Sequence, residues 1–594
     1  MNNHRYDMGL IGNCAYSALI DKNANVQWLC WPRFDSSFIF GGLLDQGKAG
    51  HFKICPSTKN YTSTQRYLDN TNVLVTRFES PEGVFEVIDF APRFLLFERQ
   101  HKPLMLFRKI KKILGSPRIL VDCSPVGDYG KLTPLHMQGS NHIRYEGLEQ
   151  PVRLTTNASL TYLVEKRDFA LSEDLYFVLS WGIPLEGPLE STFEEFLSRT
   201  TRYWMKWVES CTLPSIFQKE VIRSALTLKL HQYEDTGAII ASCTTSLPEI
   251  PGEGRNWDYR FCWLRDTYYT ISALNSLGHF DEMERYAHFI ENLNLDQLES
   301  LQPVYRIDGS PEMTEIELPM EGYLGNQPVR IGNQAASQIQ HDAYGQVLLA
   351  LYSLYTDERL IDRHVRSSTQ MMKRVLKYLE KTMEEPDNGV WEFRGKRAVH
   401  AYTLLFHWAG SAAILKIARK IGDGDLEARA LKSRDHAASL LESCYDSEKK
   451  AYTQAIGSKD LDASMLQMIT LGFLIDHPLE RSMGHLAAIE KELELSPGFL
   501  LRYRHQDDFG LQKSAFLVCS FWHIEALASL GLGDRAEELF KRVLVAQNHL
   551  GLMSEDYDLE TGSQWGNFPQ TYSHVGLINC AFAIDRARRK PGFL

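Results

Sequence analysis

Two glutamates lie in loop-like segments where they could act as a general acid and a general base. Glu392 directly follows Trp391, and Glu555 is followed closely by Asp556 and Asp558. An apolar, aromatic setting favours the neutral form of a carboxyl group, which a general acid needs near neutral pH. Glycoside hydrolysis typically uses two carboxyl groups that flank the scissile bond. On spacing alone, either neighbouring aspartate could replace Glu555 in such a pair.

A second concentration of polar and aromatic residues lies in GRNWDYRFCWLRD, residues 254–266. Arginine beside aspartate supplies donors and acceptors for sugar hydroxyls, and tryptophan offers a flat apolar face for a sugar ring. The candidates for binding a sugar here are Trp257, Asp258, Trp263, Arg265 and Asp266. In the alternative, structural interpretation, Asp266 caps the following helix and the arginines form salt bridges.

After about residue 215 the apolar residues follow a helical period, and the helices are expected to hold these loops. Most apolar helices are followed by a turn and a more charged helix, and a final apolar helix makes twelve. The apolar helices open near Lys219, Asp266, Asp342, Thr403, Asp462 and Ser514. This alternation favours an inner ring wrapped by an outer ring, an (α/α)6 barrel, over an open helical solenoid. In such a toroid the loops would gather at one end.

Residues 1–190 show short alternating runs separated by Gly, Pro, Asn and Asp, which indicate an antiparallel β-sandwich. Residues 191–214 form an amphipathic stretch, expected to be a helical linker capped by Ser191 or Thr192. The chain is therefore predicted to be a multi-domain α and β protein. Its barrel would span residues 215–594.

Composition excludes several classes of protein. The 594 residues carry 64 Lys+Arg against 75 Asp+Glu, and this net charge of −11 argues against a nucleic-acid binder. The ten cysteines are scattered without metal-ligand spacing, so we expect no metal site and no disulfide scaffold. Without a long apolar run or a signal-like N-terminus, we expect a cytoplasmic protein with no membrane contact. Oligomeric state, including a homo-oligomer, stays open.

Five motifs in order resemble the family 15 glycoside hydrolases, the group that contains bacterial glucoamylases and trehalases. They are IGNCAYSALIDKNANVQWLCWPRFDSS, GRNWDYRFCWLRD, VRIGNQAASQIQHDAYGQVL, NGVWEFRG and GLMSEDYDLETGSQWGNFPQTYSHVGLI, and they span nearly the whole chain. The resemblance implies a β-sandwich joined to an (α/α)6 barrel. It also implies exo-acting, inverting hydrolysis of an α-glucoside or oligosaccharide, with no cofactor.

The same resemblance assigns roles to individual residues. Glu392 would be the general acid and Glu555 the general base. Arg265 and Asp266 would bind the hydroxyls of the non-reducing glucose. Other residues implied to line or tune the pocket are Trp263, Trp391, Arg502 and Asp387.

Two positions depart from the family pattern. Leu404 replaces a basic residue that the family commonly has, and Lys513 replaces an acidic one. Both lie at openings of predicted inner helices, so we expect them to set leaving-group preference. Which α-glucoside is cleaved stays open among trehalose, maltose, maltodextrin and isomaltose.

Two other functions fit a similar architecture. An inverting glycoside phosphorylase needs only the acid, because phosphate is its nucleophile, and Glu555 in its motif argues against that function. A non-catalytic glycan-binding protein on the same scaffold would not need both glutamates.

Overall fold

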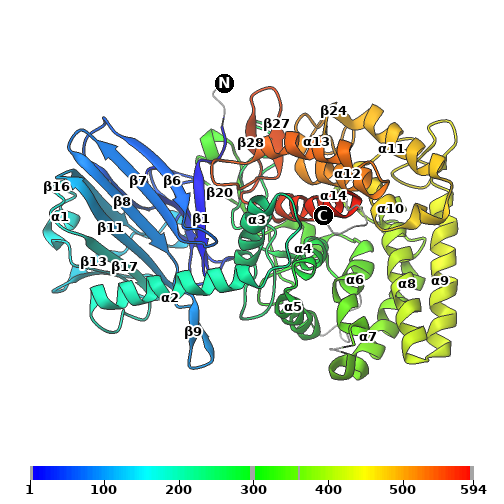
Figure 1. Cartoon of the computed structure of the whole chain (residues 1–594), viewed down its shortest axis with the longest axis horizontal. Helices are drawn as coiled ribbons and strands as arrows, with labels where there is room; N and C mark the ends of the chain where they lie inside the picture. The colour runs from blue at the N-terminus through cyan, green and yellow to red at the C-terminus, as the bar shows by residue number, and fades with distance from the viewer. Residues whose placement is uncertain (1–3, 294–300, 359–360, 589–594) are drawn as a thin grey trace.

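The computed structural model describes residues 4–293, 301–358 and 361–588. β-sheets occupy the N-terminal part and helices the C-terminal part, with a long helix running from one to the other (Figure 1). None of the helices in the described part of the chain is long and apolar enough to cross a membrane.

The N-terminal part contains two large antiparallel sheets. The first has the order β1 (Met8–Gly12), β2 (Ser17–Asp21), β3 (Asn25–Cys30), β5 (His51–Pro56), β12 (Arg118–Ser124), β16 (Phe169–Ala170), with β4 (Phe38–Phe40) beside β3. The second has the order β13 (Leu135–Gln138), β14 (His142–Glu146), β15 (Val152–Thr156), β17 (Leu175–Trp181), β11 (Met105–Gly115), β8 (Gly83–Phe90), β7 (Leu74–Ser80), β6 (Thr62–Tyr67). The predicted antiparallel sheet domain is confirmed.

A buried ion pair joins the two sheets. Arg108 of β11 pairs with Asp89 of β8 through atoms 2.7 Å apart, and both side chains are fully buried. The same guanidinium donates to the carbonyl oxygens of Phe52 at 2.7 Å and Ala24 at 2.6 Å, which belong to the facing sheet. A buried charge is tolerated when it is paired and hydrogen-bonded in this way. The pair therefore fixes the two sheets against each other.

Helix α2 (Leu189–Glu209) runs along the sheets towards the helical part (Figure 1). Its Phe193 packs against Phe90 and Phe107 of the second sheet, with ring centroids 5.3 and 5.2 Å apart. The helix starts after Pro188 without a side-chain cap, so the expected cap at Ser191 or Thr192 is wrong. The division of the chain at residues 190 and 215 stays a prediction.

Six inner elements of the helical part contact one another in a closed cycle, because the last of them also contacts the first. They are α4 (Leu264–Ser276), α6 (Asp342–Thr356), α8 (Ala401–Ile421), η4 with α10 (Ala463–Leu466, Gln467–Thr470), α12 (Leu517–Ser529) and α14 (Thr571–Arg588). The partners outside them are α5 (Phe280–Asn292), α7 (Ile361–Thr382), α9 (Gly424–Glu442), α11 (Leu479–Leu493), α13 (Gly533–Val543) and α3 (Gln218–Leu230). This arrangement is the predicted (α/α)6 barrel.

One assignment within the barrel was wrong. The helix opening near Lys219 was expected in the inner ring, but this helix, α3, packs on α14 and contacts β1. It is apolar because it is covered on one side by the barrel and on another by the sheet domain. The final helix, α14, takes the inner position between α12 and α4.

Candidate active site

Loops at one end of the barrel surround a cavity that opens to solvent. Eight of the ten predicted site residues line it: Trp257, Trp263, Arg265, Asp266, Trp391, Glu392, Arg502 and Glu555. They come from segments that are far apart in sequence, from Trp257 to Glu555. Only the closed ring of helices can bring them together.

Glu392 lies in a strained backbone conformation at the cavity wall. Its φ of 61° is in the left-handed region, which is uncommon for residues other than glycine. Its backbone N–H donates to the carbonyl of Gly389 at 3.1 Å, and its carbonyl accepts from Gln338 at 3.0 Å. Its Oε1 accepts hydrogen bonds from Trp263 Nε1 at 2.8 Å and Arg265 Nη2 at 3.2 Å. The carboxyl group is therefore held in one orientation.

Glu555 is buried and directly precedes strand β27 (Asp556–Asp558). Its Oε1 accepts a hydrogen bond from the Tyr259 hydroxyl at 3.0 Å, while its Oε2 has no partner within the protein. Burial raises the pKa of Glu555 well above its usual value, and the nearby carboxyls of Glu249 and Asp556 raise it further. The unpartnered oxygen can accept a hydrogen bond from a water molecule.

The structure separates Glu555 from its two competitors. Asp556 does not line the cavity, and its Oδ1 accepts from the Ser514 hydroxyl at 2.7 Å. Asp558 also lies outside the cavity lining and accepts from the backbone of Glu560 at 2.9 Å. A Cβ at Gly566 would lie 2.7 Å from Glu555 Cβ, so glycine is required there to let Glu555 face the cavity.

Tyr259 and Trp263 connect the two glutamates. Their rings are edge to face, with centroids 5.4 Å apart. Trp263 donates to Glu392 at 2.8 Å, and Tyr259 donates to Glu555 at 3.0 Å. The two carboxyl groups therefore lie at the two ends of an aromatic pair.

Arg265 and Asp266 lie in the first turn of α4, at the buried end of the cavity. Arg265 donates to the Tyr572 hydroxyl at 2.8 Å and to the carbonyl of Val390 at 2.9 Å. The helix begins at Leu264, so the alternative of Asp266 as its N-cap is wrong. Asp266 Oδ2 is buried and lies 3.3 Å from Arg265 Nη2, and burial raises the pKa of this carboxyl to about 6.

The side chains of Trp391 and Arg502 form another part of the cavity wall, and hydrogen bonds hold each of them in place. Trp391 Nε1 donates to Asp462 Oδ2 at 2.7 Å, which fixes the plane of its ring. Arg502 Nη2 donates to Glu249 at 2.5 Å and to Gln512 at 3.0 Å.

Asp258 was predicted to bind a sugar, and Asp387 to line or tune the pocket. Neither lines the cavity, and both are fully buried, so the structure lends no support to a direct contact of either with substrate. Asp387 accepts from the backbone N–H groups of His341 at 2.9 Å and Gly389 at 3.1 Å, and from the Thr403 hydroxyl at 2.8 Å. It holds the start of the loop that carries Glu392. Burial raises the pKa of Asp387 to about 7.

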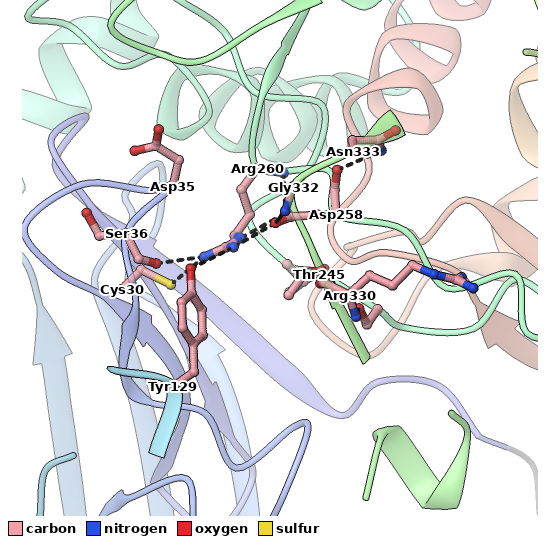
Figure 2. A network of polar contacts seen from close by, with 12 residues as sticks. Cys30, Asp35, Ser36, Tyr129, Thr245, Asp258, Arg260, Arg330, Gly332 and Asn333 are labelled. Atoms are coloured by element: carbon pink, nitrogen blue, oxygen red, sulfur yellow. Dashed lines mark hydrogen bonds and ion pairs between the residues drawn. The ribbon is translucent and has the colours of Figure 1, made fainter. Parts of the chain in front are cut away.

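Asp258 belongs to a polar network that ties the sheet domain to the active-site loop (Figure 2). Its two carboxylate oxygens accept from Arg260 at 2.8 and 2.7 Å. Arg260 also donates to the carbonyl of Ser36 at 2.7 Å and contacts the Tyr129 hydroxyl at 3.4 Å, both in the N-terminal part. Tyr259 lies between the paired residues in sequence, so the network fixes the backbone that presents its hydroxyl to Glu555.

We expect Arg260→Met to lower the free energy of unfolding by about 3–5 kcal/mol, because it leaves the buried Asp258 without its ionic partner. Chemical denaturation measures this change. The control is Arg144→Met, which removes a half-exposed arginine of the sheet domain and should change stability little. Equal losses in the two variants would show that the network does not stabilise the fold.

Several cavity residues escaped the sequence analysis. Glu249 lines the cavity and binds Arg502 and Trp257, yet it lies in a proline-containing loop without a periodic signal. Tyr259 was inside a quoted motif but was not selected, because a single tyrosine is more often a core residue. Asp507 and Phe509 also line the cavity, and no local pattern indicated it.

The two departures from the family pattern lie away from the cavity. Leu404 is fully buried within α8, and Lys513 has a side chain 70% exposed that pairs with Glu253 at 2.7 Å. Neither is part of the lining, and their effect on leaving-group preference stays a prediction.

Comparisons with known proteins agree with this geometry. The family model for glycosyl hydrolases family 15 matches residues 215–582, and the model for a trehalase-like N-terminal domain matches residues 4–169. A trehalase of Thermoplasma volcanium is 32% identical over 98% of this chain and 94% of its own length. A trehalase of Mycobacterium tuberculosis is 31% identical over 98% of this chain and 90% of its own length.

The fold also matches a solved structure, a bacterial glucoamylase complexed with acarbose, with a TM-score of 0.68. The identity is 15%, and the match covers 98% of this chain and 94% of that one. The chain is therefore a glycoside hydrolase and belongs to glycosyl hydrolases family 15.

Proposed function

We propose that this glycoside hydrolase cleaves α,α-trehalose to two glucose molecules with inversion at the anomeric carbon. Glu392 acts as general acid and Glu555 as general base. The named relatives that match over nearly the whole chain are trehalases, which supports the choice of substrate. No residue assignment depends on that choice, because maltose presents the same terminal α-glucose.

The proposal rests on one observation, the position of two carboxyl groups at opposite ends of the Trp263–Tyr259 pair within one cavity. An inverting enzyme separates its acid and base by about 6.5–9.5 Å to leave room for a water molecule. Two carboxyl groups that are connected through two aromatic rings suit this larger separation better than the ~5–5.5 Å found between the two carboxyl groups of a retaining enzyme.

Each glutamate has the partners that its proposed role requires. Glu392 is bound through Oε1 to an indole N–H and a guanidinium, which hold the carboxyl beside the glycosidic oxygen that it protonates. Glu555 keeps Oε2 free to take a proton from the attacking water, while Tyr259 orients the other oxygen. Asp266 and Arg265 bind hydroxyl groups of the glucose ring at the buried end of the cavity.

The stereochemistry of the products tests the substrate and the mechanism together. Inversion at one carbon of trehalose releases that glucose as the β-anomer, while the leaving glucose keeps its α configuration. Proton NMR of a fresh reaction in phosphate-free buffer should therefore show equal initial amounts of α- and β-glucose. Release of α-glucose alone would contradict inversion, and activity on maltose with none on trehalose would contradict the substrate. A requirement for phosphate would identify a phosphorylase.

A further inference from the structure

The residues that line the cavity range from buried to exposed, which distinguishes an inner end from an outer end. Arg265 and Asp266 at the inner end are 9% and 4% exposed. At the outer end, the lining residues Arg394 and Asp508 are exposed to solvent. In a longer substrate, a sugar ring beyond the two that flank the scissile bond would lie towards this outer end.

A short segment crosses that outer end, residues 504–511, which we call the strap. Its first anchor is Asp507, which accepts from Arg255 Nη1 at 2.9 Å and Nη2 at 2.7 Å in a two-pronged ion pair. Asp507 also accepts from the Tyr503 hydroxyl at 2.6 Å. Arg255 is only 4% exposed, so solvent screens this pair weakly. The anchor joins the strap to the loop that carries Tyr259.

The second anchor joins the strap to the opposite loop, which carries Glu392. Asp508 accepts from the backbone N–H of Arg394 at 2.7 Å and that of Gly395 at 3.4 Å. A Cβ at Gly395 would lie 2.8 Å from Asp508 Oδ1, so the two loops are in close contact. The strap is thus fixed on both sides of the cavity mouth.

An aromatic side chain fills the space between the two anchors. The ring of Phe509 packs edge to face on Trp257, with centroids 5.1 Å apart. The guanidinium groups of Arg255 and Arg394 lie 5.4 and 5.5 Å from the Phe509 centroid, which suits cation–π contact. This packing leaves Phe509 as part of the cavity wall.

A second hollow lies on the other side of the strap. It shares Phe393, Asp507 and Asp508 with the catalytic cavity and continues along residues 454–460. The strap and the Glu392 loop therefore border both hollows. A third sugar ring that extends from the catalytic cavity along residues 454–460 would have to pass them.

We propose that the strap is a specificity determinant that limits the substrate to two sugar rings. It closes the side of the catalytic cavity where the third ring of a longer glucan would lie. The proposal rests on the proposed function, because it takes a glucosyl disaccharide as the substrate of this site.

The test compares kcat/KM for maltotriose with that for the best disaccharide, trehalose or maltose, in the wild type and four variants of the full-length protein. Asp508→Ala and Phe509→Ala each open the strap, and their combination opens it further. Asp508→Asn is the matched control, because its amide oxygen still accepts from Arg394. We expect the wild-type ratio to disfavour maltotriose and the double variant to raise the ratio at least about tenfold, with the control close to wild type.

Two results would overturn the proposal. One is a wild-type enzyme that hydrolyses maltotriose as efficiently as the disaccharide. The other is an unchanged ratio in the single variants while their melting temperatures and pH profiles stay those of the wild type. If the enzyme cleaves maltose but not trehalose, the proposed function is refuted. The strap can still be tested in that case, because the ratio is then measured with maltose as the disaccharide.

Discussion

The variant Glu392→Gln should retain the fold and lose about 10²–10⁴-fold in kcat on trehalose. Glutamine preserves the shape of the side chain and can still accept from Trp263 and Arg265, but it has no proton to give to the leaving oxygen. The loss should appear mainly in kcat, because the contacts to the bound sugar are made by other residues. Steady-state kinetics and a thermal melt measure both parts of this prediction.

The leaving group provides the control for this assignment. Fluoride departs without protonation, so α-glucosyl fluoride bypasses the need for a general acid. Glu392→Gln should therefore recover most of its activity on this substrate relative to trehalose. If activity on both substrates falls equally, Glu392 does not protonate the leaving group.

Replacement of Glu555 by glutamine should lower turnover by a similar factor of about 10²–10⁴, but on both substrates. Attack by water is required whatever the leaving group, and glutamine cannot accept the proton of that water. Near-normal hydrolysis of the fluoride by Glu555→Gln would remove this residue from the role of base. The variant Asp556→Asn is the matched comparison, because Asp556 is the adjacent buried carboxyl outside the cavity.

The pH dependence of kcat/KM independently tests the assignment of Glu555 as the general base. Burial and the carboxyl of Glu249 raise the pKa of Glu555, so its charged form appears only at higher pH than for an ordinary glutamate. Because only the charged form accepts a proton, kcat/KM in the wild type should rise with pH through that raised pKa. An acid limb centred near pH 4.5, the usual value for glutamate, would contradict the environment described for Glu555.

Much of the architecture was readable from local patterns. Alternation of apolar residues predicted strands such as β7 and β8, and helical periodicity predicted the paired helices of the barrel. Such patterns are local because side chains alternate with period two in strands and recur every 3.6 residues in helices. The assignment of each helix to the inner or the outer ring does not follow from a local pattern. We misplaced α3 because burial by the sheet domain makes its sequence as apolar as that of an inner helix.

The residues of the site also divide into those that the sequence motifs placed and those that only the structure placed. The motifs identified the residue types and placed Glu392, Glu555, Arg265 and Asp266 correctly in one cavity. Asp258 lies beside cavity residues in sequence, yet it faces away to pair with Arg260 (Figure 2). Asp387 likewise supports the loop instead of lining the cavity. A motif records which residues are near in the chain, while the direction of each side chain depends on contacts with distant segments.

The sequence by itself determined that this chain joins antiparallel sheets to a ring of paired helices, and it proposed Glu392 and Glu555 as an acid–base pair. Only the tertiary structure decided which of Glu555, Asp556 and Asp558 faces the cavity, that Tyr259 and Trp263 connect the glutamates, and that the strap crosses the mouth. The reason is physical. Secondary structure follows from neighbouring residues, but the cavity is made by loops far apart in sequence that meet when the ring of helices closes.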